Sequence, residues 1–248
     1  MKRFLIIAGV VVLVIIIGLT IFTLIASEDR PEAISGGKAE NLAQKIYDAT
    51  NKEAWDSLDY IRWTFRESNH YTWDKQQNLV EVMWDEYRVL LDPESVSGIA
   101  FKKGDQLKGE EEQRLLEEAF KLFCNDGFWM NAFTKLHDPG TNRGIHISEK
   151  GDTSLLVTYT SGGVTPGDAY LWKVDDEGLP LSFKMWVSII PVGGLEFTWE
   201  DWDTLYNGAL IAQNHSSELL EVPITGIKSG PTLTSVGKND TLFMPLEK

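Results

Sequence analysis

One apolar segment near the start of the chain limits the protein more than any other feature. Residues Phe4 to Ala26 form a run of 23 residues without a charged side chain. A helix of this length crosses a hydrocarbon core of about 30 Å with room for tilt. A cleaved signal peptide has a shorter apolar stretch and a small-x-small cleavage site, whereas Leu24 stands here where a small residue is needed. We therefore expect residues 1–27 to form an uncleaved transmembrane signal anchor.

The charges on either side of this run predict its orientation. Lys2 and Arg3 precede it, and an acidic segment from Glu28 to Glu32 follows it. Positive charges stay on the cytoplasmic side of a membrane helix, so the rest of the chain is expected beyond the membrane. The sequence has a bacterial character, which predicts a single-pass inner-membrane protein with its C-terminal domain in the periplasm. The membrane is the expected partner of the N-terminal helix.

The net charge of the chain excludes one class of partner. The formal charge is −14, and Lys2 and Arg3 are the only charges before Glu28. An acidic domain repels nucleic acid, so nucleic-acid binding is excluded.

The single cysteine, Cys124, cannot form an intramolecular disulfide, and its apolar neighbours favour a small buried hydrophobe over a reactive thiol. No cysteine lies near the end of the apolar run, which excludes a lipoprotein-type lipid anchor.

Alternating apolar residues predict strands after a linker over residues 28–37 and a helix over residues 38–55. Ile61, Trp63 and Phe65 alternate with polar residues, which is typical of a half-buried strand. We expect further strands around residues 71–73, over 79–91 with a bulge or bend near Asp85-Glu86, and over 98–103. A second helix is expected over residues 110–124. The turn signal Asn125-Asp126-Gly127 would end it, ahead of an aromatic loop or short helix over 128–136.

The C-terminal half contains a second set of strand patterns separated by turn signals. Strands are expected around residues 155–159, 170–174, 183–189 and 195–199, and Gly-rich or acidic turns between the later ones indicate antiparallel hairpins. The whole pattern predicts one α+β domain over residues 38–228, with a long antiparallel sheet and two helices packed against it. Residues 229–248 are expected to form a loosely ordered tail.

The order of these elements resembles the periplasmic lipoprotein carriers of the LolA-like half-barrel superfamily. The segment from Tyr170 to Pro180, in which an acidic turn and Gly178-Leu179-Pro180 join two strands, is similar to a strand–turn–strand unit of that group. Segments 70–74 and 193–202 are similar to uncharacterised membrane-anchored proteins of Bacteroidetes type. The resemblance covers residues 38–228. It implies a long curved sheet, a half-barrel wrapped around two helices, with an apolar cavity for acyl chains.

The sequence contains no common catalytic or nucleotide-binding motif. A serine elbow, a phosphate-binding loop, His-Glu-x-x-His and Cys-x-x-Cys are all absent. His137 and His146 flank a Pro-Gly turn, but a metal site needs three or four converging ligands. His70 and Asp74 are near enough in sequence to orient one another, although the adjacent Trp73 favours a packing role. A Ser-His-Asp triad stays open because geometry and not sequence order defines it. We expect no catalytic residue, no bound metal and no cofactor.

Large apolar side chains on one face of the predicted strands are the most informative feature of the domain. Two interpretations stay open: these side chains fill a core against the two helices, or some of them line an apolar pocket. An indole N–H needs a partner when it is buried, which favours the pocket. The pocket candidates are Trp63, Phe65, Trp73, Trp84, Trp172, Phe183, Met185, Phe197 and Trp199.

Three functions are compatible with these observations. The first is a non-catalytic, membrane-anchored periplasmic protein that binds an apolar ligand, either a lipid or a lipoprotein acyl chain. Because the carriers shuttle freely and this chain is expected to be tethered, a membrane-bound receptor, sensor or accessory protein is favoured. The second is a protein–protein interaction module of the cell envelope with a filled core. The third is an envelope hydrolase, which would need His70, His137 or His146 to meet a carboxylate in a pocket.

Overall fold

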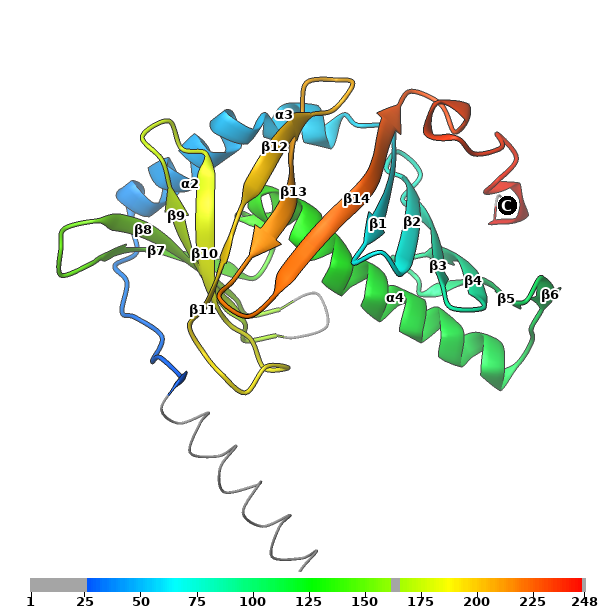
Figure 1. The fold of residues 1–248 in the computed structure, drawn as a ribbon, viewed down its shortest axis with the longest axis horizontal. Coiled ribbons are helices and arrows are strands. Elements are labelled where there is room, and N and C mark those ends of the chain that lie inside the picture. The colour runs from blue at the N-terminus through cyan, green and yellow to red at the C-terminus, as the bar shows by residue number, and fades with distance from the viewer. Residues whose placement is uncertain (1–25, 162–165, 247–248) are drawn as a thin grey trace, which may run out of the picture.

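The structure is a computed structural model that describes residues 26–161 and 166–246. It is an α+β fold of large antiparallel sheets with few helices (Figure 1). The helices are α2 (Gly37–Thr50), α3 (Lys52–Asp56) and α4 (Glu110–Asn131), with short 3-10 helices η1 (Ala132–Lys135), η2 (Thr234–Val236) and η3 (Met244–Leu246). The strands are β1 (Tyr60–Phe65), β2 (Asn69–Asp74), β3 (Leu79–Trp84), β4 (Tyr87–Asp92), β5 (Ser97–Lys102), β6 (Asp105–Gln106), β7 (Thr141–Ile147), β8 (Thr153–Tyr159), β9 (Ala169–Val174), β10 (Pro180–Trp186), β11 (Leu195–Thr198), β12 (Glu200–Thr204), β13 (Leu210–Ser216) and β14 (Glu221–Gly230).

These strands form two sheets and not the single long sheet that the sequence predicted. One has nine strands in the order β12-β13-β14-β1-β2-β3-β4-β5-β6, and the other has five in the order β11-β10-β9-β8-β7. The chain changes sheet at Trp199, the one residue between β11 and β12, whose N–H donates to the Leu181 carbonyl at 2.8 Å. The Trp199 side chain is buried, so the point at which the chain passes from one sheet to the other lies against the hydrophobic core. Neither sheet closes into a barrel within the described residues.

A helix packs against each sheet, and the C-terminal end of α4 contacts both sheets because Trp129 also packs against β10 and β11. Figure 1 shows the nine-stranded sheet arching over α4, which packs against β4, β5 and β13. The shorter helix α2 packs against β7 and β8 of the five-stranded sheet. Gly178, in the turn before β10, has a φ of +99° and lies so close to α2 that an added Cβ would come within 2.8 Å of the Lys45 carbonyl oxygen. A side chain here would therefore push the turn off the helix.

The strand alternation that the sequence showed places the predicted faces inward. In β1, Ile61, Trp63 and Phe65 are buried and alternate with half-buried residues. The register then stacks Trp63 beside Tyr71 in β2, which in turn pairs with Val82 in β3. Directly opposed residues lie on the same face of a sheet, so each such row extends one apolar surface across several strands.

The single strand predicted over residues 79–91 is two strands, because the bulge or bend expected near Asp85-Glu86 is the turn of a hairpin. Trp84 of β3 pairs directly with Tyr87 of β4, and Asp85 occupies the turn with a φ of +46°. Opposed residues across a two-residue turn share a face although one is even-numbered and the other odd-numbered. This explains why the apolar parity of the sequence changes at residues 85–86.

Both predicted helix ends also differ from the structure. The expected helix over residues 38–55 divides at Asn51, which has a left-handed φ of 53° and caps α3 by accepting a hydrogen bond from the Ala54 N–H. The second helix continues through Asn125-Asp126-Gly127 to Asn131. Asp126 is buried and accepts a hydrogen bond from the Tyr71 hydroxyl, so a tertiary contact overrides the local turn signal.

The predicted loose tail is also wrong. Residues 229–230 belong to β14, and Phe243 is only 2% exposed because it packs with Leu79, Leu90 and Leu233. Lys238 forms an ion pair with the buried Glu81 of β3. The tail therefore covers the outer face of the nine-stranded sheet.

The predicted membrane anchor falls almost entirely on residues 1–25, outside the described residues. Within the described ranges, no helix combines the length and apolar character that a bilayer span requires. The anchor remains a prediction from the sequence.

Candidate functional site

The nine pocket candidates all lie at or near the inner faces of the two sheets. Trp73 is half-buried, and the other eight are no more than 6% exposed. The structure brings them together in two groups, one per sheet. The first comprises Trp63, Phe65, Trp73 and Trp84, and the second comprises Trp172, Phe183, Met185, Phe197 and Trp199.

Aromatic residues of α4 and η1 occupy the space beside these groups. Phe123 contacts Trp63 and Trp73 at ring-centroid distances of 6.4 and 5.2 Å. Trp129 contacts Phe183 and Phe197 at 5.6 and 4.8 Å. Phe123 lies in the helix that the sequence predicted, whereas Trp129 was assigned to an aromatic loop or short helix, because the turn signal Asn125-Asp126-Gly127 placed the helix end before it. The inner face is therefore a packed core, one of the two interpretations that the sequence left open.

The core nevertheless contains polar atoms that lack a hydrogen-bond partner in the described part of the chain. They include the indole nitrogens of Trp63, Trp172 and Trp199 and the Nε2 atom of His215. Trp199 lies between two of the others, with ring-centroid distances of 5.2 Å to Trp172 and 4.4 Å to His215. An unpaired buried donor costs about 1–3 kcal/mol. The unpaired polar atoms therefore destabilise this part of the core, and the packing of the aromatic rings offsets that cost.

His215 is the buried histidine of the core, and its surroundings shift its pKa. It is fully buried on β13, and its Nδ1 donates to the Thr198 carbonyl at 3.0 Å, which defines the neutral tautomer. Burial lowers the pKa of His215 to about 4 from an ordinary value of 6.5. The imidazole is therefore neutral at physiological pH, and protonating it in the folded state lowers the stability of the fold.

We expect His215 to make the fold sensitive to mild acid. The unfolded chain binds the proton with a pKa near 6.5 and the folded chain only near 4, so stability is complete above the higher value and falls as pH drops between them. Across this pH range the free energy of unfolding falls by on the order of 3 kcal/mol. Urea unfolding should show this slope in the native protein and lose it in His215→Gln. The exposed His70→Gln variant should keep it, and an unchanged slope in His215→Gln would contradict the assignment.

A buried polar cluster lies beside the first aromatic group. Asp126 of α4 accepts hydrogen bonds from the Tyr71 hydroxyl at 2.5 Å and from Asn69 at 2.8 Å. Tyr71 also stacks on Trp63 with ring centroids 4.7 Å apart. Burial, with the nearby Asp126 carboxylate, raises the pKa of Tyr71 far above its usual value, so the phenol stays protonated as a donor. This cluster fixes the C-terminal part of α4 to the sheet.

One of the three histidines considered for hydrolysis meets a carboxylate. His137 Nε2 lies 3.0 Å from Glu40, but Arg143 also binds Glu40, at 2.9 Å. The hydrogen bond from Arg143 is the main reason that the pKa of Glu40 lies below its usual value, which makes this carboxylate a weak base. His70 contacts the Thr64 hydroxyl, and His146 contacts the Glu32 carbonyl. The described residues contain no cluster of three His, Cys, Asp or Glu side chains suited to a metal ion.

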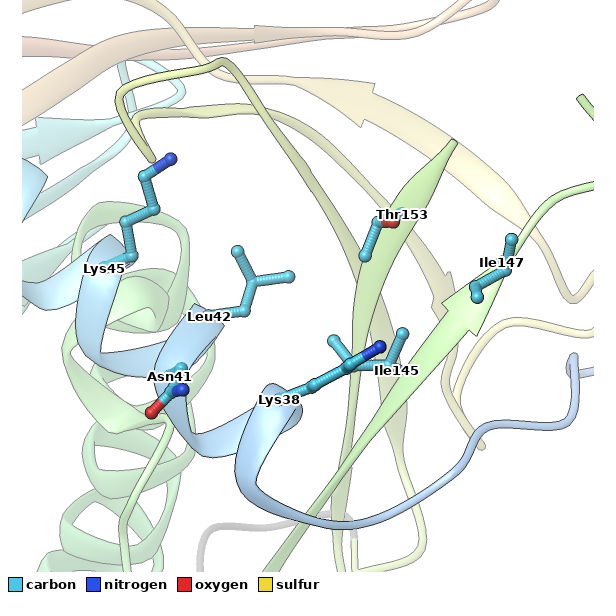
Figure 2. A pocket seen from close by; sticks show the side chains of 7 residues that line it. All are labelled: Lys38, Asn41, Leu42, Lys45, Ile145, Ile147 and Thr153. Carbon is cyan, nitrogen blue, oxygen red and sulfur yellow. The ribbon is translucent and has the colours of Figure 1, made fainter. Parts of the chain in front are cut away.

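A groove lies between α2 and the five-stranded sheet (Figure 2). Its volume is 260 Å³, and it is lined by Lys38, Asn41, Leu42, Lys45, Ile145, Ile147 and Thr153. Leu42 and Ile145 form an apolar floor, while Ile147 at the end of β7 is 60% exposed. No local sequence pattern predicts this groove, because α2 and β7 are about a hundred residues apart in the chain.

The rim of the groove is cationic on a domain that is otherwise acidic. Lys38 and Lys45 lie on the exposed side of α2, and neither is in an ion pair among the residues that the structure describes. The Lys45 ammonium donates to the backbone carbonyl of Asp176. A second groove, of 340 Å³, lies between α4 and the turn at Ser95 and Val96, and Glu117 and Lys121 of opposite charge line it. Only the first groove combines an apolar floor with unpaired positive charge.

Comparisons with known proteins give little further information. No protein-family model and no curated protein matches the sequence. Among solved structures, a DUF1329 family protein from Desulfovibrio piger matches with a TM-score of 0.41 and 7% sequence identity, over 83% of this chain and 96% of that chain. At this similarity no ligand and no residue role is carried over. The LolA-like resemblance stays a prediction.

Proposed function

We propose that the protein is a membrane-anchored, non-catalytic periplasmic module that binds the acyl chain of a lipid or lipoprotein. The observation that supports this is the groove between α2 and β7–β8. Its floor of Leu42 and Ile145, with the exposed Ile147 beside it, suits a hydrocarbon chain. Its rim of Lys38 and Lys45 suits an anionic group at the chain's end. Ligand pockets usually measure about 300–1,000 Å³, so a groove of 260 Å³ holds part of one chain.

The aromatic face takes a different role in this proposal from the one that the resemblance implied. Its rings pack on one another and on α4, so they stabilise the domain and the ligand lies at the surface. The apolar N-terminal run would hold the groove near the membrane, where acyl chains are abundant.

Photocrosslinking in nanodiscs tests this function. The full chain is reconstituted with a diazirine-bearing fatty acid, irradiated and mapped by mass spectrometry. We expect labelled peptides from α2 and β7. The exposed Ile147→Asp substitution and the double change Lys38→Glu with Lys45→Glu should each lower that labelling about tenfold, equivalent to about 1.4 kcal/mol.

The matched control is Lys121→Glu in the second groove, which should leave labelling of α2 and β7 unchanged. Labels confined to the N-terminal run, or labelling of α2 that ignores all three groove substitutions, would contradict the proposal.

A second candidate is the envelope interaction module, which the packed aromatic core favours. In that case the same groove would take apolar side chains of a partner protein. A photoreactive amino acid in place of Ile147 would then crosslink to one protein in intact cells, while the fatty-acid probe labels neither α2 nor β7.

A further inference from the structure

The loop between β10 and β11 differs from the rest of this acidic domain. The segment from Met185 to Leu195 contains no charged residue, although the chain has a net charge of −14. Ile189, within this loop, is 65% exposed, and Pro191 is exposed as well. An exposed apolar side chain at such a position is stabilised only when an apolar surface, such as a bilayer or another protein, removes it from water.

The described chain begins at this loop and is held there by several contacts. Glu28 N–H donates to the Gly193 carbonyl at 2.9 Å, and Gly193 N–H donates to the Ser27 hydroxyl at 2.9 Å. The Trp186 indole donates to the Glu28 carbonyl at 2.8 Å, and Lys184 pairs with the Glu28 carboxylate at 2.6 Å. Residues 27 and 28 are therefore fixed against the loop on both backbone and side-chain atoms.

Two glycines allow this close approach. Gly194 has a φ of +82°, and an added Cβ would lie 2.7 Å from the Glu28 Cβ. At Gly193 an added Cβ would lie 2.5 Å from the Trp186 ring. Side chains at these positions would separate the loop from the entering chain.

The covalent reach of the chain sets the position of the loop relative to a bilayer. Glu28 lies two residues beyond Ala26, the end of the apolar run, and an extended residue spans at most about 3.6 Å. The clamped part of the loop therefore lies within about 7 Å of the end of the run. The polar interface on each side of the hydrocarbon core is about 5–7 Å thick. If the run crosses the membrane, the loop has to lie at the interface.

We propose that the β10–β11 loop is a second membrane contact, in which Ile189 enters the phospholipid bilayer beside the N-terminal anchor. This inference rests on the membrane anchoring in the proposed function and is independent of the groove. Trp186, half-buried next to the loop, is of the residue type that concentrates at membrane interfaces. The contact is apolar and the domain is acidic, so it does not require anionic lipids. Its consequence is a fixed orientation of the domain on the membrane.

Spin-label accessibility in nanodiscs of phosphatidylcholine tests the inference with the full chain. A Cys124→Ser background carries one label at a time, introduced by Ile189→Cys, by Met244→Cys as the exposed C-terminal control, or by Leu13→Cys within the apolar run. Power saturation compares collision with oxygen, which concentrates in lipid, and with a nickel chelate, which stays in water. We expect oxygen to dominate at residues 189 and 13 and nickel to dominate at residue 244.

Two results would overturn the inference and separate it from the anchor. If residue 13 lies in lipid while residue 189 is as accessible to nickel as residue 244, the anchor stands and the loop contact is wrong. If residue 13 is itself in water, the anchoring fails and the loop contact fails with it. The first result would also mean that any apolar surface that covers Ile189 belongs to a protein and not to the bilayer.

Discussion

Trp172→Ala is expected to destabilise the domain by about 3–5 kcal/mol, the range for truncating a fully buried tryptophan. The side chain is 0% exposed and contacts Phe183 and Trp199, both at ring-centroid distances of 5.2 Å. Removing it leaves a cavity between the ring of Phe183 in the five-stranded sheet and the ring of Trp199 at the junction of the two sheets. Urea unfolding of the full chain in non-ionic detergent, followed by tryptophan fluorescence, measures the loss.

Two matched variants separate packing from hydrogen bonding. Trp172→Phe keeps an aromatic ring and removes an N–H that has no partner in the described part of the chain, so we expect a loss below about 2 kcal/mol. Leu181→Ala, at a half-exposed position on β10, should change stability by no more than about 0.5 kcal/mol. A loss under about 1 kcal/mol for Trp172→Ala would mean that the ring borders open space. That result would favour the interpretation in which the aromatic face lines an apolar cavity for acyl chains.

Lys238→Met is expected to cost about 3 kcal/mol, because it removes one of two cations from a buried carboxylate. The Glu81 side chain is 3% exposed and pairs with Lys238 and with Arg88, the latter at 2.6 Å. Without Lys238, Arg88 alone has to compensate the buried charge, and the C-terminal tail loses its polar contact with β3. Chemical unfolding near neutral pH measures the loss. Exposure of Phe243 to limited proteolysis should rise in parallel.

The same carboxylate predicts a dependence on acid. Burial by itself raises the pKa of Glu81, but the hydrogen bonds from Lys238 and Arg88 outweigh it and hold the pKa below its ordinary value of 4.5. A lowered pKa means that the ion pairs contribute fully above that ordinary value and are lost as pH falls through the folded-state pKa. This window lies below most of the His215 transition. Glu81→Gln should remove the lower-pH part of the slope only.

The control for this pair is Arg114→Met, which breaks an exposed pair with Glu118 on the surface of α4. Such pairs contribute no more than about 0.5 kcal/mol, so this variant should unfold almost as the native protein does. Equal losses for Lys238→Met and Arg114→Met would show that the tail contributes nothing to stability.

The sequence by itself determined the features that depend on near neighbours in the chain. Alternation at Ile61, Trp63 and Phe65 gave a strand with the correct inward face, and the apolar spacing before Cys124 gave most of α4. The strand and helix predictions succeed because burial on one face imposes a period of 2 on strands and of about 3.6 on helices. The exclusion of nucleic acid from the net charge and the anchor over the run from Phe4 to Ala26 stay predictions.

Only the tertiary structure decided how distant segments meet. It continued α4 past Gly127 because Tyr71 donates to Asp126, and it divided the strands into two sheets at the buried Trp199. It packed the aromatic face against Trp129 and joined α2 to β7 to make the groove. Local sequence carries no information on which buried partner a side chain will find. The free energy of that contact, a few kcal/mol, is large enough to override a turn signal or a helix propensity of about 1 kcal/mol.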